Sequence, residues 1–198
     1  MKHVNYTHKI VELIKEAQKI ASEHGFHNLL QPGLVKELII ADILGHDVHK
    51  TKHKADAHSP DNFEIKYEYL SCFQTGSFQL DRMFKSPETK RQKSLERISR
   101  NEAIYCAVFD KNNPLNILQI YEVETDVLLC ETERQLHESI NDISHIGFSV
   151  KWVKENGEKV YDNGKLLRDV NQRSTSSVSK EFNQVLAQLA VRPNGFHQ

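Results

Sequence analysis

The chain has 198 residues, of which 38% are hydrophobic and 27% are charged, and its formal net charge is −1. This is the composition of an ordinary globular domain, without the ~18–20 consecutive apolar residues that cross a bilayer and without the apolar core of a signal peptide. Three widely spaced cysteines favour a reduced, cytoplasmic compartment over a disulfide framework, and the net charge gives no global sign of a nucleic-acid partner.

Two helices are expected at the start of the chain. Apolar residues recur at helical spacing over residues 7–23, and Gly25 follows the end of this pattern. Residues 34–44 are apolar around most of the helix circumference up to Gly45, which predicts a buried helix. Glu37 is an acid on this largely apolar helix, and it is therefore a candidate functional residue.

A pair of strands is predicted next, over residues 53–58 and 62–70, with a short polar turn between them. On the second strand, aromatic and apolar residues alternate with Glu64, Lys66 and Glu68, which share one face. A half-buried strand has this pattern whatever its function, and a same-face ion pair between Glu64 and Lys66 also accounts for it. Glu68 is expected to be solvated, with a place beside a metal as the alternative.

The rest of the chain predicts a mixture of strands and helices. In chain order these are a basic helix over 86–100, strands over 104–109 and 117–124, a helix from 125 to about 141, a hairpin of 148–153 and 158–161 across Asn156-Gly157, and a helix over 178–190. This order predicts an α/β or α+β fold with a mixed central β-sheet flanked by helices. We expect a single domain over residues 1–198.

One group of residues has the composition of a catalytic site. Asp56 precedes the polar turn, and Glu64 and Lys66 follow it on one face of the second strand. Two carboxylates are the hard oxygen ligands that Mg²⁺ and Mn²⁺ prefer. A lysine beside them is suited to position an attacking water or to stabilise a phosphoryl transition state. These residue types at this spacing indicate a metal-dependent phosphodiesterase.

The arrangement of Asp56, a short hairpin, Glu64-Ile65-Lys66 and a following helix and strands resembles the PD-(D/E)XK nuclease superfamily. That superfamily includes type II restriction endonucleases and mismatch-repair strand-nicking enzymes. The resemblance implies a restriction endonuclease-like core over about residues 34–141. The helix over 7–23 and the hairpin and helix over 146–190 are then additions to this core.

The resemblance also implies roles for individual residues. Asp56 and Glu64, with the backbone carbonyl of Ile65, would bind Mg²⁺, for which Mn²⁺ substitutes. Lys66 would act on the attacking water or on the transition state. Glu37 matches a metal-associated glutamate that some members place on the preceding helix.

Basic side chains after the second strand are candidates for contacts with DNA phosphates. They are Arg82, Lys85, Lys90, Arg91, Lys93 and Arg97, with Arg173 on a polar loop nearer the C-terminus. The 11 histidines show no zinc-ligand spacing, and the sequence has no nucleotide-binding loop.

The sequence therefore predicts a Mg²⁺-dependent endonuclease for double-stranded DNA, of the type II restriction class that the resemblance implies. Such an enzyme is expected to act as a homodimer on a palindromic site, because the symmetry of the protein matches that of the DNA. It is also expected to have a cognate DNA methyltransferase in the cell. Two alternatives stay open. One is a repair, recombination or phage nuclease on the same core, and the other is a DNA-binding module without cleavage.

Overall fold

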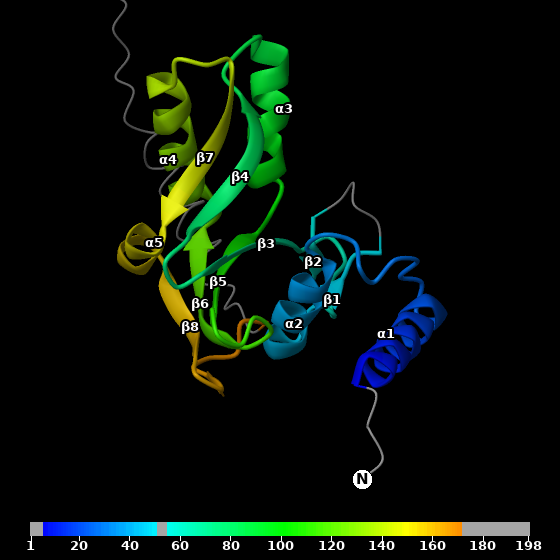
Figure 1. The fold of residues 1–198 in the computed structure, drawn as a ribbon. Coiled ribbons are helices and arrows are strands. Elements are labelled where there is room, and N and C mark those ends of the chain that lie inside the picture. The colour runs from blue at the N-terminus through cyan, green and yellow to red at the C-terminus, as the bar shows by residue number, and fades with distance from the viewer. Residues whose placement is uncertain (1–5, 51–54, 172–198) are drawn as a thin grey trace, which may run out of the picture.

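A computed structural model describes residues 6–50 and 55–171 of the chain (Figure 1). The predicted helix over 178–190 and the loop with Arg173 lie outside the described residues. The helices are α1 (Tyr6–Glu23), α2 (Leu34–Leu44), α3 (Glu88–Ser99), α4 (Thr125–Glu138) and α5 (Val150–Asn156). The strands are β1 (Asp47–Val48), β2 (Ala57–His58), β3 (Lys66–Phe73), β4 (Ser77–Phe84), β5 (Ala103–Phe109), β6 (Ile117–Glu124), β7 (Ile143–Ser149), β8 (Glu158–Asp162) and β9 (Lys165–Leu166).

The described chain has a mixed α+β fold with a curled sheet flanked by helices, as the sequence predicts. The main sheet has seven strands in the order β1-β2-β3-β5-β6-β8-β9. All neighbouring pairs are antiparallel except β3 and β5, which are parallel and are joined by a crossover through β4 and α3. Strands β4 and β7 form a separate two-stranded sheet that lies beside α3 and α4 (Figure 1).

The central strand β5 is buried along its whole length because both of its faces are covered. Its residues alternate between two hydrophobic cores. Ile104, Cys106 and Val108 pack in a core with side chains of β4, β7, α3 and α4. Tyr105 and Phe109 pack in a second core with side chains of α2. A continuous apolar run is typical of such a strand, and the predicted strand over 104–109 is confirmed.

The strand predicted over 62–70 begins later than expected. Strand β3 starts at Lys66 and extends to Phe73. The preceding residues form a loop, in which Ser59 N donates to Ile65 O at 2.9 Å and Ile65 N donates to Asn62 O at 3.1 Å. Glu64 therefore lies in the loop before the strand and not on the strand.

The predicted hairpin across Asn156-Gly157 is wrong, because the first of its two segments is helical. Residues Val150–Asn156 form α5, and Ser149 caps it by accepting a hydrogen bond from Trp152 N at 3.0 Å. A Cβ atom on Gly157 would lie 2.9 Å from both Glu122 O and Val153 O. The glycine thus permits a close approach of the chain to β6 after the end of α5, and it is not part of a two-residue turn.

Strands β4 and β7 were not predicted, and an irregularity explains why β4 was missed. In their antiparallel pairing, Leu80 lies opposite Ile146 and Met83 lies opposite Ser144. Asp81 and Arg82 together therefore face the single residue between those partners, which is a β-bulge. Arg82 has a φ of 53°, and both bulge residues are exposed, so the strict alternation of buried and exposed residues is lost.

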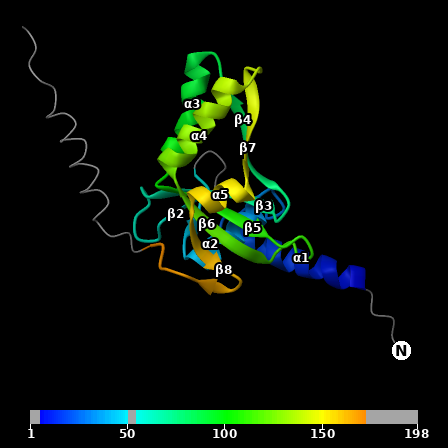
Figure 2. The same cartoon turned by 90° about the vertical axis from the view of Figure 1, so that its left-hand side faces the viewer.

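Helix α1 projects from the rest of the described chain (Figures 1 and 2). Its last turns are anchored by Gln18, whose side chain accepts a hydrogen bond from Leu29 N at 2.8 Å, and by the buried Ala21. Its apolar side chains are exposed, namely Tyr6, Ile10, Val11, Leu13, Ile14 and Ile20. Within the described ranges, no helix combines the length and the apolar character that a membrane crossing requires.

Candidate functional site

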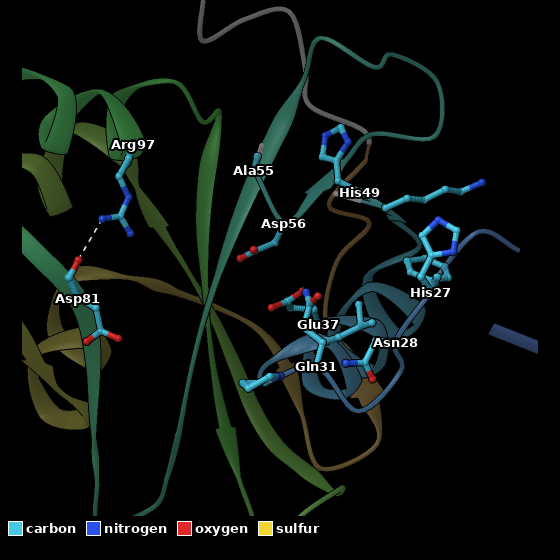
Figure 3. A pocket seen from close by; sticks show the side chains of 13 residues that line it. His27, Asn28, Gln31, Glu37, His49, Ala55, Asp56, Asp81 and Arg97 are labelled. Atoms are coloured by element: carbon cyan, nitrogen blue, oxygen red, sulfur yellow. Dashed lines mark hydrogen bonds between the residues drawn. The ribbon is translucent and has the colours of Figure 1, made fainter. Parts of the chain in front are cut away.

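A polar cavity of about 480 Å³ lies beside the start of α2 and the residues that lead into β2 (Figure 3). Figure 3 shows the side chains of Glu37 and Asp56 pointing into the same space, with Arg97 and Asp81 on the opposite wall. His49 also lines the cavity. The structure thus brings together Asp56, Glu37 and Arg97, three residues that the sequence selected.

Asp56 is held by the hairpin of β2 and β3. Its Oδ2 atom accepts a hydrogen bond from Tyr69 N at 2.8 Å. Burial raises the pKa of the Asp56 carboxyl to about 6, although the Tyr69 hydrogen bond and the charges of Arg100 and Arg97 act to lower it. The carboxylate is therefore short of compensating positive charge.

Glu68 is the acid that faces Asp56. The antiparallel pairing of Ala57 with Tyr67 continues by one residue to place Asp56 opposite Glu68. Burial, together with the charges of Asp56 and Glu37, raises the pKa of the Glu68 carboxyl to about 8, although the charges of Arg100 and Arg97 act to lower it. Its Oε2 atom is buried and accepts no hydrogen bond from the described residues, and it lies 3.7 Å from Arg100 Nη2. The expectation of a solvated Glu68 is wrong.

Glu37 comes from the first turn of α2. Its carboxylate lies against Gly33, because a Cβ atom on Gly33 would be 2.6 Å from Glu37 Oε1. Gly33 also has a φ of 93°, a backbone conformation that favours glycine. This glycine therefore leaves room for the Glu37 carboxylate at the start of the helix.

The motif residues Glu64, Ile65 and Lys66 do not line this cavity. The Glu64 side chain is 79% exposed, and its Oε2 atom lies 3.4 Å from Lys66 Nζ in an ion pair. The Ile65 carbonyl accepts the hydrogen bond from Ser59 N within the loop. The structure brings Asp56 together with Glu68 and not with Glu64. Two positions after Glu68, where a lysine would complete the pattern, stands the buried Leu70.

The acidic side chains of the cavity and of β3 fit a divalent cation in part. Among residues 6–50 and 55–171, no group of three or more His, Cys, Asp or Glu side chains has the arrangement of a metal site. The pair of Asp56 and Glu68 nevertheless has the chemistry that such a cation needs. Both groups are hard oxygen donors, both have raised pKa values, and Glu68 Oε2 is buried without a donor. A cation between them would favour the ionised form of both carboxylates, which burial disfavours.

The predicted DNA-contacting cations fall into two groups. Arg82, Lys90, Lys93 and Arg97 line an open groove of about 460 Å³ over β4 and α3, together with Phe84 and Ser94. None of these four forms an ion pair with another described residue. Lys85 and Arg91 form contacts with α4 instead, and Arg173 lies outside the described residues.

The contacts of these two residues are structural. Lys85 Nζ donates to His137 O at 3.1 Å and to Ser139 O at 2.7 Å, at the end of α4. Arg91 forms an ion pair with Glu133 of α4 at 2.9 Å. Both therefore connect neighbouring elements and are not available to a ligand in this conformation.

The sequence matches no protein-family model and no curated protein. The assignment of a function therefore depends on the residues of the cavity and the groove. The sequence selected Asp56, Glu37 and the groove cations as candidates, but it missed the pairing of Asp56 with Glu68. The signal that would have found Glu68 is the strand register, since Asp56 meets Glu68 once Ala57 pairs with Tyr67.

Proposed function

We propose that the protein is a Mg²⁺-dependent endonuclease that hydrolyses phosphodiester bonds in double-stranded DNA at a specific sequence, in the manner of a type II restriction enzyme. One observation carries this proposal. Two largely buried carboxylates, Asp56 and Glu68, stand at facing positions of neighbouring chain segments, and Asp56 lines a polar cavity; burial disfavours the ionised form of both. A pair of buried carboxylates is costly to ionise unless a positively charged ligand binds between them, so such a pair indicates a cation site.

The carboxylates of Asp56 and Glu68 would hold the cation, and Glu37 would bind a water or a second ion beside them. When bound, Mg²⁺ lowers the pKa of a coordinated water and offsets charge on the phosphate. In the reaction, the water oxygen forms a bond to phosphorus as the bond to the leaving sugar oxygen breaks. The water gives one proton to solvent and the leaving oxygen takes one from solvent, so the products are a phosphate monoester and a hydroxyl group.

The order of the elements supports the proposal. Helix α2 carries Glu37, the antiparallel strands β1, β2 and β3 carry the facing acids, and α3 lies in the crossover to the parallel strand β5. An acid hairpin followed by a helix and further strands is what the resemblance to PD-(D/E)XK nucleases implies. The basic groove over α3 supports a polyanionic substrate, because four cations in one hollow attract phosphate groups.

The test compares Glu68, which lies on β3, with Glu64, which lies in the loop before that strand. The wild-type protein is incubated with long, unmethylated duplex DNA and Mg²⁺ or Mn²⁺, beside variants Glu68→Gln and Glu64→Gln and an EDTA control. We expect discrete fragments from the wild type and from Glu64→Gln. Glu68→Gln should lose at least about 100-fold in rate, since metal stabilisation of the transition state is worth several kcal/mol. Equal cleavage by Glu68→Gln and the wild type would contradict the site.

A DNA-binding module without cleavage is the second candidate function, and Leu70 favours it. A hydrophobic residue stands where the Glu-x-Lys pattern would place its lysine after Glu68. Duplex binding without cleavage in any divalent metal would support this candidate. Nicks or a smear in place of discrete fragments would instead favour a repair, recombination or phage nuclease.

We also propose that the enzyme acts as a homodimer with a partner methyltransferase in the cell. A palindromic site presents two equivalent strands, and a two-fold dimer presents two equivalent cavities to them. The exposed apolar side chains of α1 supply a surface on which two copies could associate. Their spacing follows the alternation of four and three residues that pairs helices, in Tyr6, Ile10, Leu13, Ala17 and Ile20.

A further inference from the structure

The proposed site lacks a basic side chain at the position where the Glu-x-Lys pattern has its lysine. Negative charge spreads over the phosphate oxygens in the transition state, and a positive group at these oxygens stabilises it. The residue two positions after Glu68 is the buried Leu70. Lys66 lies two positions before Glu68, but its ammonium group is paired with Glu64 at 3.4 Å. A basic side chain from another element could supply this contact to the phosphate.

Arg97 lies where the two hollows of the molecule meet. It lines the cavity that contains Asp56 and Glu37, and it also lines the groove of Arg82 and Lys90. Its charge acts to lower the pKa of both Asp56 and Glu68, so its guanidinium is within electrostatic reach of the acids.

Arg100 also acts electrostatically on Asp56 and Glu68, but its position differs. Its guanidinium Nη2 atom lies 3.7 Å from Glu68 Oε2, and it lines neither the cavity nor the groove. Arg100 therefore serves as a partner of Glu68. Arg97 is exposed on α3 and can contact a ligand that spans both hollows.

The β-bulge of β4 holds Arg97 in this place. Arg97 Nη1 donates to Asp81 O at 3.0 Å, and this is the guanidinium's one hydrogen bond to the described residues. Asp81 and Arg82 are the two bulge residues, and the first lines the cavity while the second lines the groove. The left-handed φ of 53° at Arg82 is a strained conformation for a residue other than glycine. One local distortion thus sets the position of three residues around the junction.

We propose that Arg97 binds the scissile phosphate and takes the place of the missing lysine, while Arg82, Lys90 and Lys93 bind neighbouring phosphates of the same backbone along the groove. This inference rests on the proposed nuclease function. The guanidinium donates hydrogen bonds to the non-bridging phosphate oxygens while the water oxygen bonds to phosphorus and the sugar oxygen leaves. Arginine keeps its proton throughout, so Arg97 stabilises charge and does not act as a base.

The experiment separates binding from cleavage. Variants Arg97→Ala and Arg97→Lys are compared with Lys165→Ala, which removes one positive charge from the exposed strand β9. Binding of a short duplex is measured in EDTA by fluorescence anisotropy over a range of salt concentrations. Cleavage is measured in Mg²⁺ as kcat and KM, and thermal unfolding verifies that each variant is folded.

We expect Arg97→Ala to reduce the slope of log affinity against log salt concentration by about 1, because one phosphate contact is lost. Its kcat should fall by about 100-fold or more. Arg97→Lys should retain the salt slope but only part of kcat, because lysine keeps the charge without the two-pronged donor geometry. Lys165→Ala should match the wild type in both measurements.

The outcomes distinguish the two proposals. A wild-type protein that binds duplex without cleaving it contradicts the nuclease function, and the Arg97 contact is then judged by the salt slope alone. An unchanged salt slope in Arg97→Ala overturns the contact whether or not cleavage occurs. A kcat within about 3-fold of that of Lys165→Ala overturns the catalytic role, a difference of less than 1 kcal/mol in the barrier. Failure of the wild type to bind duplex overturns both.

Discussion

The Glu68 carboxyl makes the stability of the protein depend on pH. Its ordinary pKa of 4.5 applies in the unfolded chain, and burial raises it to about 8 in the folded protein. Below pH 4.5 the group is protonated in both states. As the pH rises from 4.5 to 8, the unfolded state loses the proton first, so the folded state becomes less stable. Asp56 acts in the same direction between its ordinary 3.8 and about 6.

We therefore expect the metal-free protein to be more stable at pH 5 than at pH 8, by on the order of a few kcal/mol. Glu68→Gln should remove most of this dependence, because glutamine is neutral at every pH. Glu64→Gln is the matched control and should leave it unchanged, since Glu64 is 79% exposed. Urea unfolding at a series of pH values in EDTA is the measurement. A flat profile for the wild type would contradict the raised pKa values.

A divalent cation should reverse this instability. Protons compete with the metal for the carboxylates, so the cation binds more tightly at pH 8 than at pH 6. Addition of Mg²⁺, Mn²⁺ or the non-reactive Ca²⁺ should raise Tm more at pH 8, because binding to the folded state alone stabilises it. Glu68→Gln and Asp56→Asn should abolish the increase. An equal increase in Glu68→Gln would place the metal elsewhere.

At the scale of elements, the contact between α5 and β6 depends on Gly157. A Cβ atom there would approach Glu122 O and Val153 O to 2.9 Å, and both are backbone atoms that cannot turn aside. Gly157→Ala should therefore destabilise the protein by about 1–3 kcal/mol. Gly147→Ala is the control, because its Cβ would have one neighbour at 4.0 Å. Denaturant unfolding measures both, and equal midpoints would contradict the close packing.

The register of one hairpin explains what the sequence predicted of the site and what it did not. The pattern of Glu64, Lys66 and Glu68 fits a strand that begins at 62 or at 66, and sequence periodicity does not distinguish the two. The loop of Ser59 and Ile65 sets the true start of β3, and this start selects Glu68 as the partner of Asp56. The choice depends on hydrogen bonds within the loop of residues 59–65, which hydrophobic periodicity does not reveal.

The longer helices and the strands with mostly apolar sequences were predictable. The helices near 7–23, 34–44, 86–100 and 125–141 are confirmed within a few residues, as are the strands over 104–109 and 117–124. Strand β4 was missed because its bulge interrupts the alternation, and α5 was missed because Asn156-Gly157 imitates a turn. Both errors occur where a residue is placed by its contact with another element, the bulge of β4 by its pairing with β7 and Gly157 by its packing against β6.

At the scale of the whole molecule, the exposed face of α1 allows a test of the dimer. Substitutions Ile10→Glu and Leu13→Glu place charge in the apolar row of α1, where both side chains are exposed. We expect these variants to be monomers in light scattering, whereas Lys15→Ala on the opposite face should remain a dimer. A wild-type protein that is monomeric at micromolar concentration, with or without duplex DNA, would contradict the dimer.

The bulge in β4 implies that thermal stability is lower than it could be and that catalytic activity depends on this difference. Removal of Arg82 alone would let Asp81 pair with His145 and keep Met83 opposite Ser144, so the ladder of β4 and β7 would become continuous. The shortened chain would lose the left-handed conformation at position 82 and should have a higher Tm than the natural one. It would also lose the backbone geometry that directs Arg97, and with it the chemistry. If deletion of Arg82 raises Tm and abolishes cleavage, the bulge is an insertion that is retained for function at a cost in stability.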